Sequence, residues 1–202
     1  MFPIYAVVIG VVAGWALGGR LANLAHIELR WAPLALVGLV AQILLFSGPI
    51  ASVVGSMGPW IYVASSALVL AVLLRNLAIP GLRIVAVGAI SNLVAIVANG
   101  GGMPASSDAL AALGKSVGEA YSNSIETASP VLPGLTDVYA LPGWLPFANV
   151  FSIGDVIIGV GIAVTVCMGM LSAGAGGKRP HGHPWLVRMG HGSGAEPPIR
   201  SA

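Results

Sequence analysis

Five apolar stretches limit what this chain can fold into, because each is long enough, or nearly so, to cross a lipid bilayer as a helix. A crossing helix needs about 20 mainly apolar residues. The stretches cover residues 4–19, 31–50, 60–79, 82–98 and 151–171. Only 8% of all residues are charged, whereas a soluble domain carries about 25%. We therefore predict an all-α transmembrane bundle of about five helices within residues 1–172, with the lipid bilayer as a partner and no nucleic acid.

The basic residues predict how this bundle is oriented. If the helices alternate in direction, one side receives Arg20, Arg30, Arg75, Arg83, Lys178, Arg179, Arg188 and Arg200. The other side receives only Lys115. Lysine and arginine accumulate in the cytoplasmic loops of membrane proteins. We therefore expect the N-terminus outside and the C-terminus in the cytoplasm.

Two segments outside the stretches differ from each other in composition. The connection 99–150 exceeds the roughly 12–15 residues beyond which loops are usually functional or disordered, and we expect one structured extracytoplasmic loop. In it, Ser106 and Ser107 are suited to cap a helix whose apolar spacing continues to Tyr121. The end of the chain, 173–202, is rich in glycine, proline and histidine, which predicts a mobile cytoplasmic tail. We predict no metal site and assign no cofactor.

Small and polar residues within the stretches predict how the helices pack. Gly10, Gly14 and Gly18 share one helix face, and this spacing favours close approach of a second helix. Gln42 and Asn92 lie at nearly equal depth in the second and fourth stretches. If those helices touch, the two amides form an interhelical hydrogen bond. The alternative is a polar position inside a ligand cavity.

Polar residues gather where the fourth stretch ends and the fifth begins. The candidate positions for a ligand or partner are Asn99, Gly100, Met103, Asn149, Ser152 and Asp155. Asp155 is the one acidic residue within a stretch, and carboxylates inside membranes are usually functional. Ser152 and Asp155 also have the spacing of a helix capping box, and Asn99 with Gly100 suits the end of a helix. Capping does not exclude a ligand at the same place.

Three short elements carry a resemblance to a known family: Asn99-Gly-Gly-Gly-Met103-Pro104, Leu135-Thr136-Asp137 and Asn149-Val-Phe-Ser152-Ile-Gly154-Asp155. Together they resemble a family of uncharacterised bacterial multi-pass membrane proteins with N-G-G-x-M-P and S-I-G-D elements. The resemblance covers roughly residues 1–172. It implies a bacterial plasma membrane and joins the outer elements into one unit, and it implies no activity.

These observations favour a non-enzymatic binding or accessory subunit with a polar site at its outer face and other membrane subunits as candidate partners. A small transporter or channel subunit is the first alternative, with Gln42, Asn92 and Asp155 lining a path. That alternative requires polar groups through the full thickness, which the cytoplasmic halves of the stretches lack. The second is a membrane-embedded enzyme acting on lipid, with Asp155 and Asp137 as acid and base. It requires two converging carboxylates, and the sequence places only Asp155 at the bilayer.

Overall fold

The computed structural model describes residues 2–47, 50, 53–114, 124–125 and 129–172. All of them belong to the first of two compact units in the chain, Met1–Ser172. The tail that we expect to be mobile, residues 173–202, lies outside the described residues.

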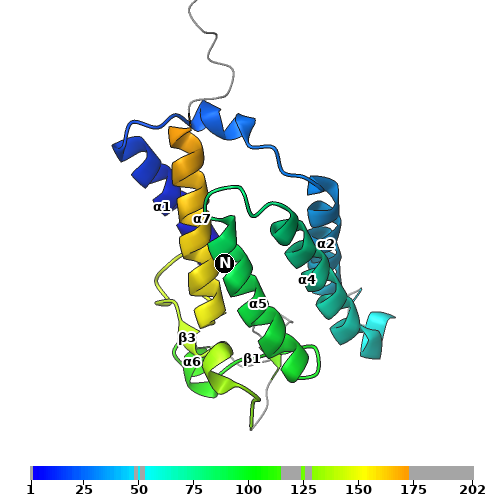
Figure 1. Ribbon diagram of the computed structural model, residues 1–202. Helices are drawn as coiled ribbons and strands as arrows, with labels where there is room; N and C mark the ends of the chain where they lie inside the picture. The colour runs from blue at the N-terminus through cyan, green and yellow to red at the C-terminus, as the bar shows by residue number, and fades with distance from the viewer. Residues whose placement is uncertain (1, 48–49, 51–52, 115–123, 126–128, 173–202) are drawn as a thin grey trace, which may run out of the picture. The chain divides into compact units, whose positions relative to one another are not determined.

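The fold is mostly helical. Its longer helices are α1 (Phe2–Ala16), α2 (Ala32–Leu45), α4 (Gly58–Arg75), α5 (Leu82–Ala98) and α7 (Ile153–Leu171). Two short 3₁₀ helices, η1 (Leu21–His26) and η2 (Gly55–Met57), precede α2 and α4. Helix α7 packs against α1 and α5, and α2 packs against α4 (Figure 1). The α5–α7 connection lies at one end of the helices, and the α1–α2 and α4–α5 connections lie at the other (Figure 1).

Two helical segments are long and apolar enough to cross a membrane, judged by length and composition. They are Gly55–Arg75, which joins η2 to α4, and Ile153–Leu171. Three further apolar helices, Pro3–Ala16, Ala32–Leu45 and Leu82–Ala98, are shorter. Each of these helices overlaps one of the predicted stretches.

Helix α1 ends at Ala16, before the predicted residue 19, because a glycine turn closes it. Gly18 has a φ of +83°, which glycine adopts without strain. The Gly18 N–H donates to the Trp15 carbonyl at 2.9 Å, and the Gly19 N–H donates to the Gly14 carbonyl at 2.7 Å. This is the hydrogen-bond pattern of a Schellman cap. The packing role predicted for Gly18 is therefore wrong, and a Cβ atom there would meet nothing within 4 Å.

The other two glycines of that motif lie against α7. A Cβ atom on Gly10 would lie 2.8 Å from the Ala163 carbonyl oxygen. A Cβ atom on Gly14 would lie 2.7 Å from the Met170 sulfur. Both distances are shorter than real Cβ contacts. Helices α1 and α7 can approach this closely because Gly10 and Gly14 have no side chain.

The contact between α5 and α7 also depends on glycine. A Cβ atom on Gly88 would lie 2.5 Å from the backbone oxygen of Gly154. A Cβ atom on Gly161 would lie 2.6 Å from the backbone nitrogen of Val85. The first of these contacts lies at the start of α7, so it fixes the loop-bearing end of α7 against α5.

The connection from α5 to α7 forms a small layer over the helix ends. Its elements are β1 (Met103–Pro104), α6 (Ser107–Ala111), β2 (Ser124–Ile125), η3 (Pro133–Leu135), β3 (Tyr139–Ala140) and β4 (Val150–Phe151). Strand β1 pairs in parallel with β2, and β3 pairs antiparallel with β4. A cluster of buried apolar residues holds α6 to the β3–β4 hairpin: Ala105, Ala109, Leu110 and Val150. We call this connection the loop layer.

Helix α6 is shorter than the sequence suggests. It ends at Ala111, and Gly114 then adopts a φ of +64°, a left-handed conformation that stops a helix. The rest of the segment in which we predicted a helix, up to Tyr121, lies outside the described residues.

Replacing Gly88 by alanine tests the contact between α5 and α7. The new methyl group would lie 2.5 Å from the Gly154 carbonyl oxygen, so the helices must separate or shift. Overpacking of this kind costs about 1–3 kcal/mol, and we expect a melting temperature several degrees below that of the wild type in detergent. Gly134→Ala is the control, because a Cβ atom there meets nothing within 4 Å. Equal melting temperatures for the two variants would contradict the close contact.

Candidate functional site

The first turn of α7 contains the predicted capping box. Ser152 is the N-cap residue and is fully buried. Its Oγ accepts a hydrogen bond from the Asp155 N–H at 3.1 Å. The Asp155 Oδ2 in turn accepts a hydrogen bond from the Ser152 N–H at 3.0 Å. These bonds satisfy two N–H groups that helix geometry leaves without partners.

Asn92 on α5 joins this cap. Its Nδ2 donates to Asp155 Oδ1 at 2.9 Å, and its Oδ1 accepts from Ser152 Oγ at 2.9 Å. The two helices therefore share a closed ring of hydrogen bonds, which we call the Asn92–Ser152–Asp155 network. Gly154 makes this possible, because a Cβ atom there would collide with Asn92 Oδ1.

The amide pair predicted between Gln42 and Asn92 is wrong. Gln42 Nε2 donates instead to Ser66 Oγ on α4, at 3.2 Å. The physical reason is the pairing of the helices, since α2 packs against α4 while α5 packs against α7. Equal depth in two helices does not make them neighbours.

Asn99 and Gly100 close α5 and tie it to the loop layer. Gly100 has a φ of +74° and donates to the Val97 carbonyl, and Gly101 donates to the Ile96 carbonyl at 2.8 Å. The side chain of Asn99 donates to the Val131 carbonyl at 2.9 Å and accepts from the Val131 N–H at 2.8 Å. Asn99 therefore fixes the loop, and its side-chain hydrogen bonds go to Ala95 and Val131 rather than to the Asn92–Ser152–Asp155 network.

Met103 and Asn149 have different surroundings. Met103 is buried with Ala95 and Ile96 of α5, so it anchors β1 to the helices. Asn149 Nδ2 donates to the Val150 carbonyl at 2.9 Å. Its Oδ1, by contrast, is a buried acceptor with no hydrogen-bond partner in the described part of the chain. Such an orphaned acceptor costs free energy unless something donates to it.

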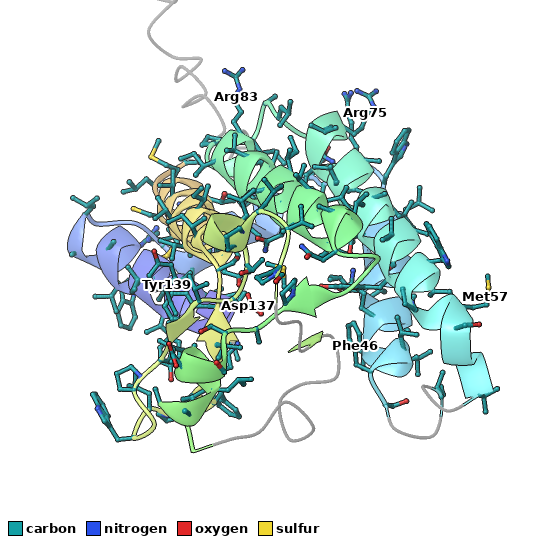
Figure 2. The ribbon with its side chains drawn as sticks, turned by 90° about the horizontal axis from the view of Figure 1, so that it is seen from below. Phe46, Met57, Arg75, Arg83, Asp137 and Tyr139 are labelled. Carbon is teal, nitrogen blue, oxygen red and sulfur yellow. The ribbon has the colours of Figure 1, made fainter. Side chains whose placement is uncertain are left out.

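Asp137, which belongs to the Leu135-Thr136-Asp137 element and to the enzyme alternative, lies within the loop layer. Its N–H donates to the Pro104 carbonyl at 2.9 Å, and its carbonyl accepts from the Ser106 N–H at 3.0 Å. The residue is 6% exposed. Burial and the nearby charge of Asp155 raise the pKa of the Asp137 carboxyl from 3.8 to about 7. Figure 2 shows Asp137 inside the loop layer.

The arginines of the described part lie away from these carboxylates. Arg75 lies over the Trp31 ring at 5.9 Å, and Arg83 Nε donates to the Leu77 carbonyl at 3.2 Å. Both arginine side chains point outward from the bundle in Figure 2. Among the described residues, no three histidine, cysteine, aspartate or glutamate side chains gather as a metal site. Neither Arg75 nor Arg83 pairs with the carboxylates at the loop end.

Comparison with known families gives one match. A family model described as a family of unknown function, DUF5317, matches residues 26–167. This range contains α5, the loop layer and most of α7. No curated protein and no solved structure matches the chain. The match fits the expectation of an uncharacterised domain.

The burial of Asp137 predicts a pH dependence of stability. The carboxyl has a pKa of about 7 in the folded protein and of about 3.8 when exposed. Between these values the folded protein holds more protons than the unfolded one, so the free energy of unfolding falls as the pH rises. Asp137→Asn removes the titrating group and with it this pH-dependent loss of stability. At pH 8 we expect the free energy of unfolding of the variant to exceed that of the wild type by at most about 4 kcal/mol. The difference in the free energy of unfolding between the two proteins should be smaller at pH 5.

Thermal unfolding of both proteins at pH 5 and pH 8, in buffer without amines or divalent cations, checks this prediction. Asp108→Asn is the control, because Asp108 is an exposed acid on α6. The prediction would be contradicted if the melting temperatures of the wild type and Asp137→Asn differed by the same amount at pH 5 and at pH 8.

Proposed function

The chain belongs to the DUF5317 family of unknown function, and we propose that it is a multi-pass plasma-membrane protein that binds a ligand or partner at its outer face without catalysing a reaction. In this proposal all five longer helices cross the bilayer. The N-terminus is outside, the C-terminus is cytoplasmic, and the loop layer covers the outer ends of α5 and α7.

The outer surface of the helices supports a lipid environment. Large apolar side chains are exposed along α1 and α2; examples are Ile9, which is 61% exposed, and Ile43, which is 70% exposed. A soluble protein seldom exposes a continuous apolar surface of this extent. Hydrocarbon is the medium in which such a surface is stable. The shorter helices are accommodated by local thinning of the bilayer or by small tilt.

The arginines support the orientation. Arg20 and Arg30 flank the α1–α2 connection, and Arg75 and Arg83 flank the α4–α5 connection. These connections lie at the end of the bundle opposite the loop layer (Figure 1). Their positive charge supports a cytoplasmic position for that end.

One observation carries the binding role: the loop layer buries the side-chain amide oxygen of Asn149 without a hydrogen-bond donor from the described residues. Leaving such a group unpaired is costly. A bound molecule that supplies donors removes that cost. The rigid attachment of the loop through Asn99 and through the Asn92–Ser152–Asp155 network keeps the site in shape.

The lipid-enzyme alternative gains one observation. Burial and the charge of Asp155 raise the pKa of the Asp137 carboxyl to about 7, and a carboxyl with such a pKa suits acid–base chemistry. However, both oxygens of Asp155 accept hydrogen bonds from Asn92 and Ser152, so Asp155 serves as a structural cap. The transporter alternative needs Gln42 and Asn92 on one path, and their partners lie on different helix pairs.

Cysteine labelling in intact cells tests the topology. In a Cys167→Ser background, Gly143→Cys lies in the loop layer and Ala25→Cys lies in η1, and both positions are exposed. We expect a membrane-impermeant maleimide to label Gly143→Cys before lysis and Ala25→Cys only after lysis. Labelling of both variants before lysis would contradict the proposed topology.

A further inference from the structure

We propose that the turn between β3 and β4 anchors the loop layer in the outer leaflet, with the Trp144 and Phe147 rings at the boundary between lipid head groups and acyl chains. We call residues 142–147 the hairpin tip. The inference rests on the proposed function, because it takes the loop-bearing end of the bundle as the outer end. It goes beyond that function by assigning a surface of the loop layer to the bilayer itself.

Hydrogen bonds give the hairpin tip a defined conformation. The Leu141 N–H donates to the Asn149 carbonyl at 3.1 Å and closes the hairpin. Within it, the Leu145 N–H donates to the Pro142 carbonyl at 2.9 Å, and the Ala148 N–H donates to the Leu145 carbonyl at 3.2 Å. Two consecutive turns therefore fix the backbone that carries the two aromatic rings.

Both rings of the hairpin tip are exposed, and one of them belongs to a strained residue. Trp144 is 81% exposed and Phe147 is 67% exposed. Phe147 also has a φ of +55°, a left-handed conformation that is unfavourable for a residue with a Cβ atom. Packing within the described part of the chain does not explain a phenylalanine at this position. Contact of the ring with an apolar medium outside the chain does, and strained residues cluster at such contact sites.

The register between α1 and α7 shows how deep the start of α1 lies. A Cβ atom on Gly10 would meet Ala163 and Val166, and a Cβ atom on Gly14 would meet Met170. The two helices therefore run side by side in the same direction. Residues of α1 can be placed level with residues of α7 by counting along this register.

Tyr5 connects this register to the hairpin tip. Tyr5 precedes Gly10 by five residues, so it is level with about residues 158–161 of α7, roughly 8–12 Å inward of Ile153 at 1.5 Å per residue. The Tyr5 hydroxyl donates to the Pro146 carbonyl, and its side chain points back toward the start of α1. The hairpin tip therefore lies beside the outer turns of α1 and α7 and does not stand above the helix ends (Figure 1).

The surface beside the hairpin tip is the one that we assign to lipid. Ile9, one turn after Tyr5, is exposed, and so is Trp60 in the first turn of α4. Aromatic side chains gather at the level where head groups meet acyl chains. No charged residue lies between Asp137 and Asp155, so insertion of the tip transfers no charge out of water. These features favour the bilayer as the partner of the tip.

Fluorescence of Trp144 in nanodiscs tests this contact. The chain has five tryptophans, so Trp15, Trp31, Trp60 and Trp185 are replaced by phenylalanine. The discs contain phosphatidylcholine with bromine atoms near either the head-group end or the methyl end of the acyl chains, because bromine quenches a ring that it touches. We expect Trp144 to lose most of its emission in the first kind of disc, to lose less in the second, and to resist acrylamide added to the water.

The matched control places the reporter elsewhere in the loop layer. Asp108→Trp is made in a chain whose five native tryptophans are all phenylalanine, because Asp108 is an exposed charged residue of α6. Acrylamide should quench its emission, and the brominated lipids should not.

A spin label gives a second measurement that leaves the other tryptophans in place. Trp144→Cys in the Cys167→Ser background carries a nitroxide, and its relaxation is measured with oxygen, which concentrates among acyl chains, and with a water-soluble nickel chelate. We expect oxygen to have the larger effect at Trp144→Cys. The chelate should have the larger effect at Asp108→Cys.

The inference is wrong if acrylamide quenches Trp144 and the brominated lipids do not, because the tip then stands in water. It is also wrong if neither quenches Trp144, because protein then covers the ring. Neither outcome changes the cysteine labelling, since the head-group layer is polar and hydrated and Gly143→Cys meets the maleimide in either case. Labelling that contradicts the topology would overturn the proposed function even if Trp144 contacts lipid.

Discussion

A carboxylate at the first turn of an apolar helix must be held by hydrogen bonds, and the contact between α5 and α7 provides them. Gly88 and Gly154 allow the two backbones to meet, which brings Asn92 within reach of Ser152 and Asp155. An unpaired carboxylate in such surroundings is costly. The same bonds fix where α7 begins. The loop layer, which connects the two helices, is therefore attached to a rigid pair of ends.

The polar groups at the loop-bearing end of the bundle are of two kinds: some have hydrogen-bond partners within the protein, and one acceptor has none among the described residues. Asn99 holds Val131, and the Asn92–Ser152–Asp155 network closes on itself, so these groups are satisfied within the protein. The Oδ1 atom of Asn149, by contrast, is buried and lacks a partner among the described residues. Buried polar groups are nearly always paired in folded proteins. The unpaired Asn149 acceptor, rather than the capping residues, is therefore the part of the candidate site that we assign to a ligand.

Much of the helical part follows from local rules that the sequence displays. The length of the apolar stretches predicts where the helices lie, Ser152 and Asp155 predict a capping box, and Asn99 with Gly100 predicts the end of α5. These features depend on residues that are close together in the chain.

The remaining features depend on residues distant in the chain, and the sequence does not fix them. The depth of Asn92 in its helix does not reveal that α5 pairs with α7 rather than with α2. The burial of Asp137 follows from its bonds to Pro104 and Ser106, which lie some thirty residues earlier. Gly18 shows a different failure, since the four-residue spacing that suggests packing continues past the point where α1 ends.

The central claim is that the Asn92–Ser152–Asp155 network couples α5 to α7, and a double-mutant cycle of Asn92→Ala and Ser152→Ala measures that coupling directly. The free energy of unfolding is determined in detergent for the wild type, both single variants and the double variant. Because the two side chains share a hydrogen bond of 2.9 Å, we predict that the losses are not additive, with a coupling energy of about 0.5–3 kcal/mol. Losses that add within about 0.3 kcal/mol would show that the two side chains act independently and would contradict the account.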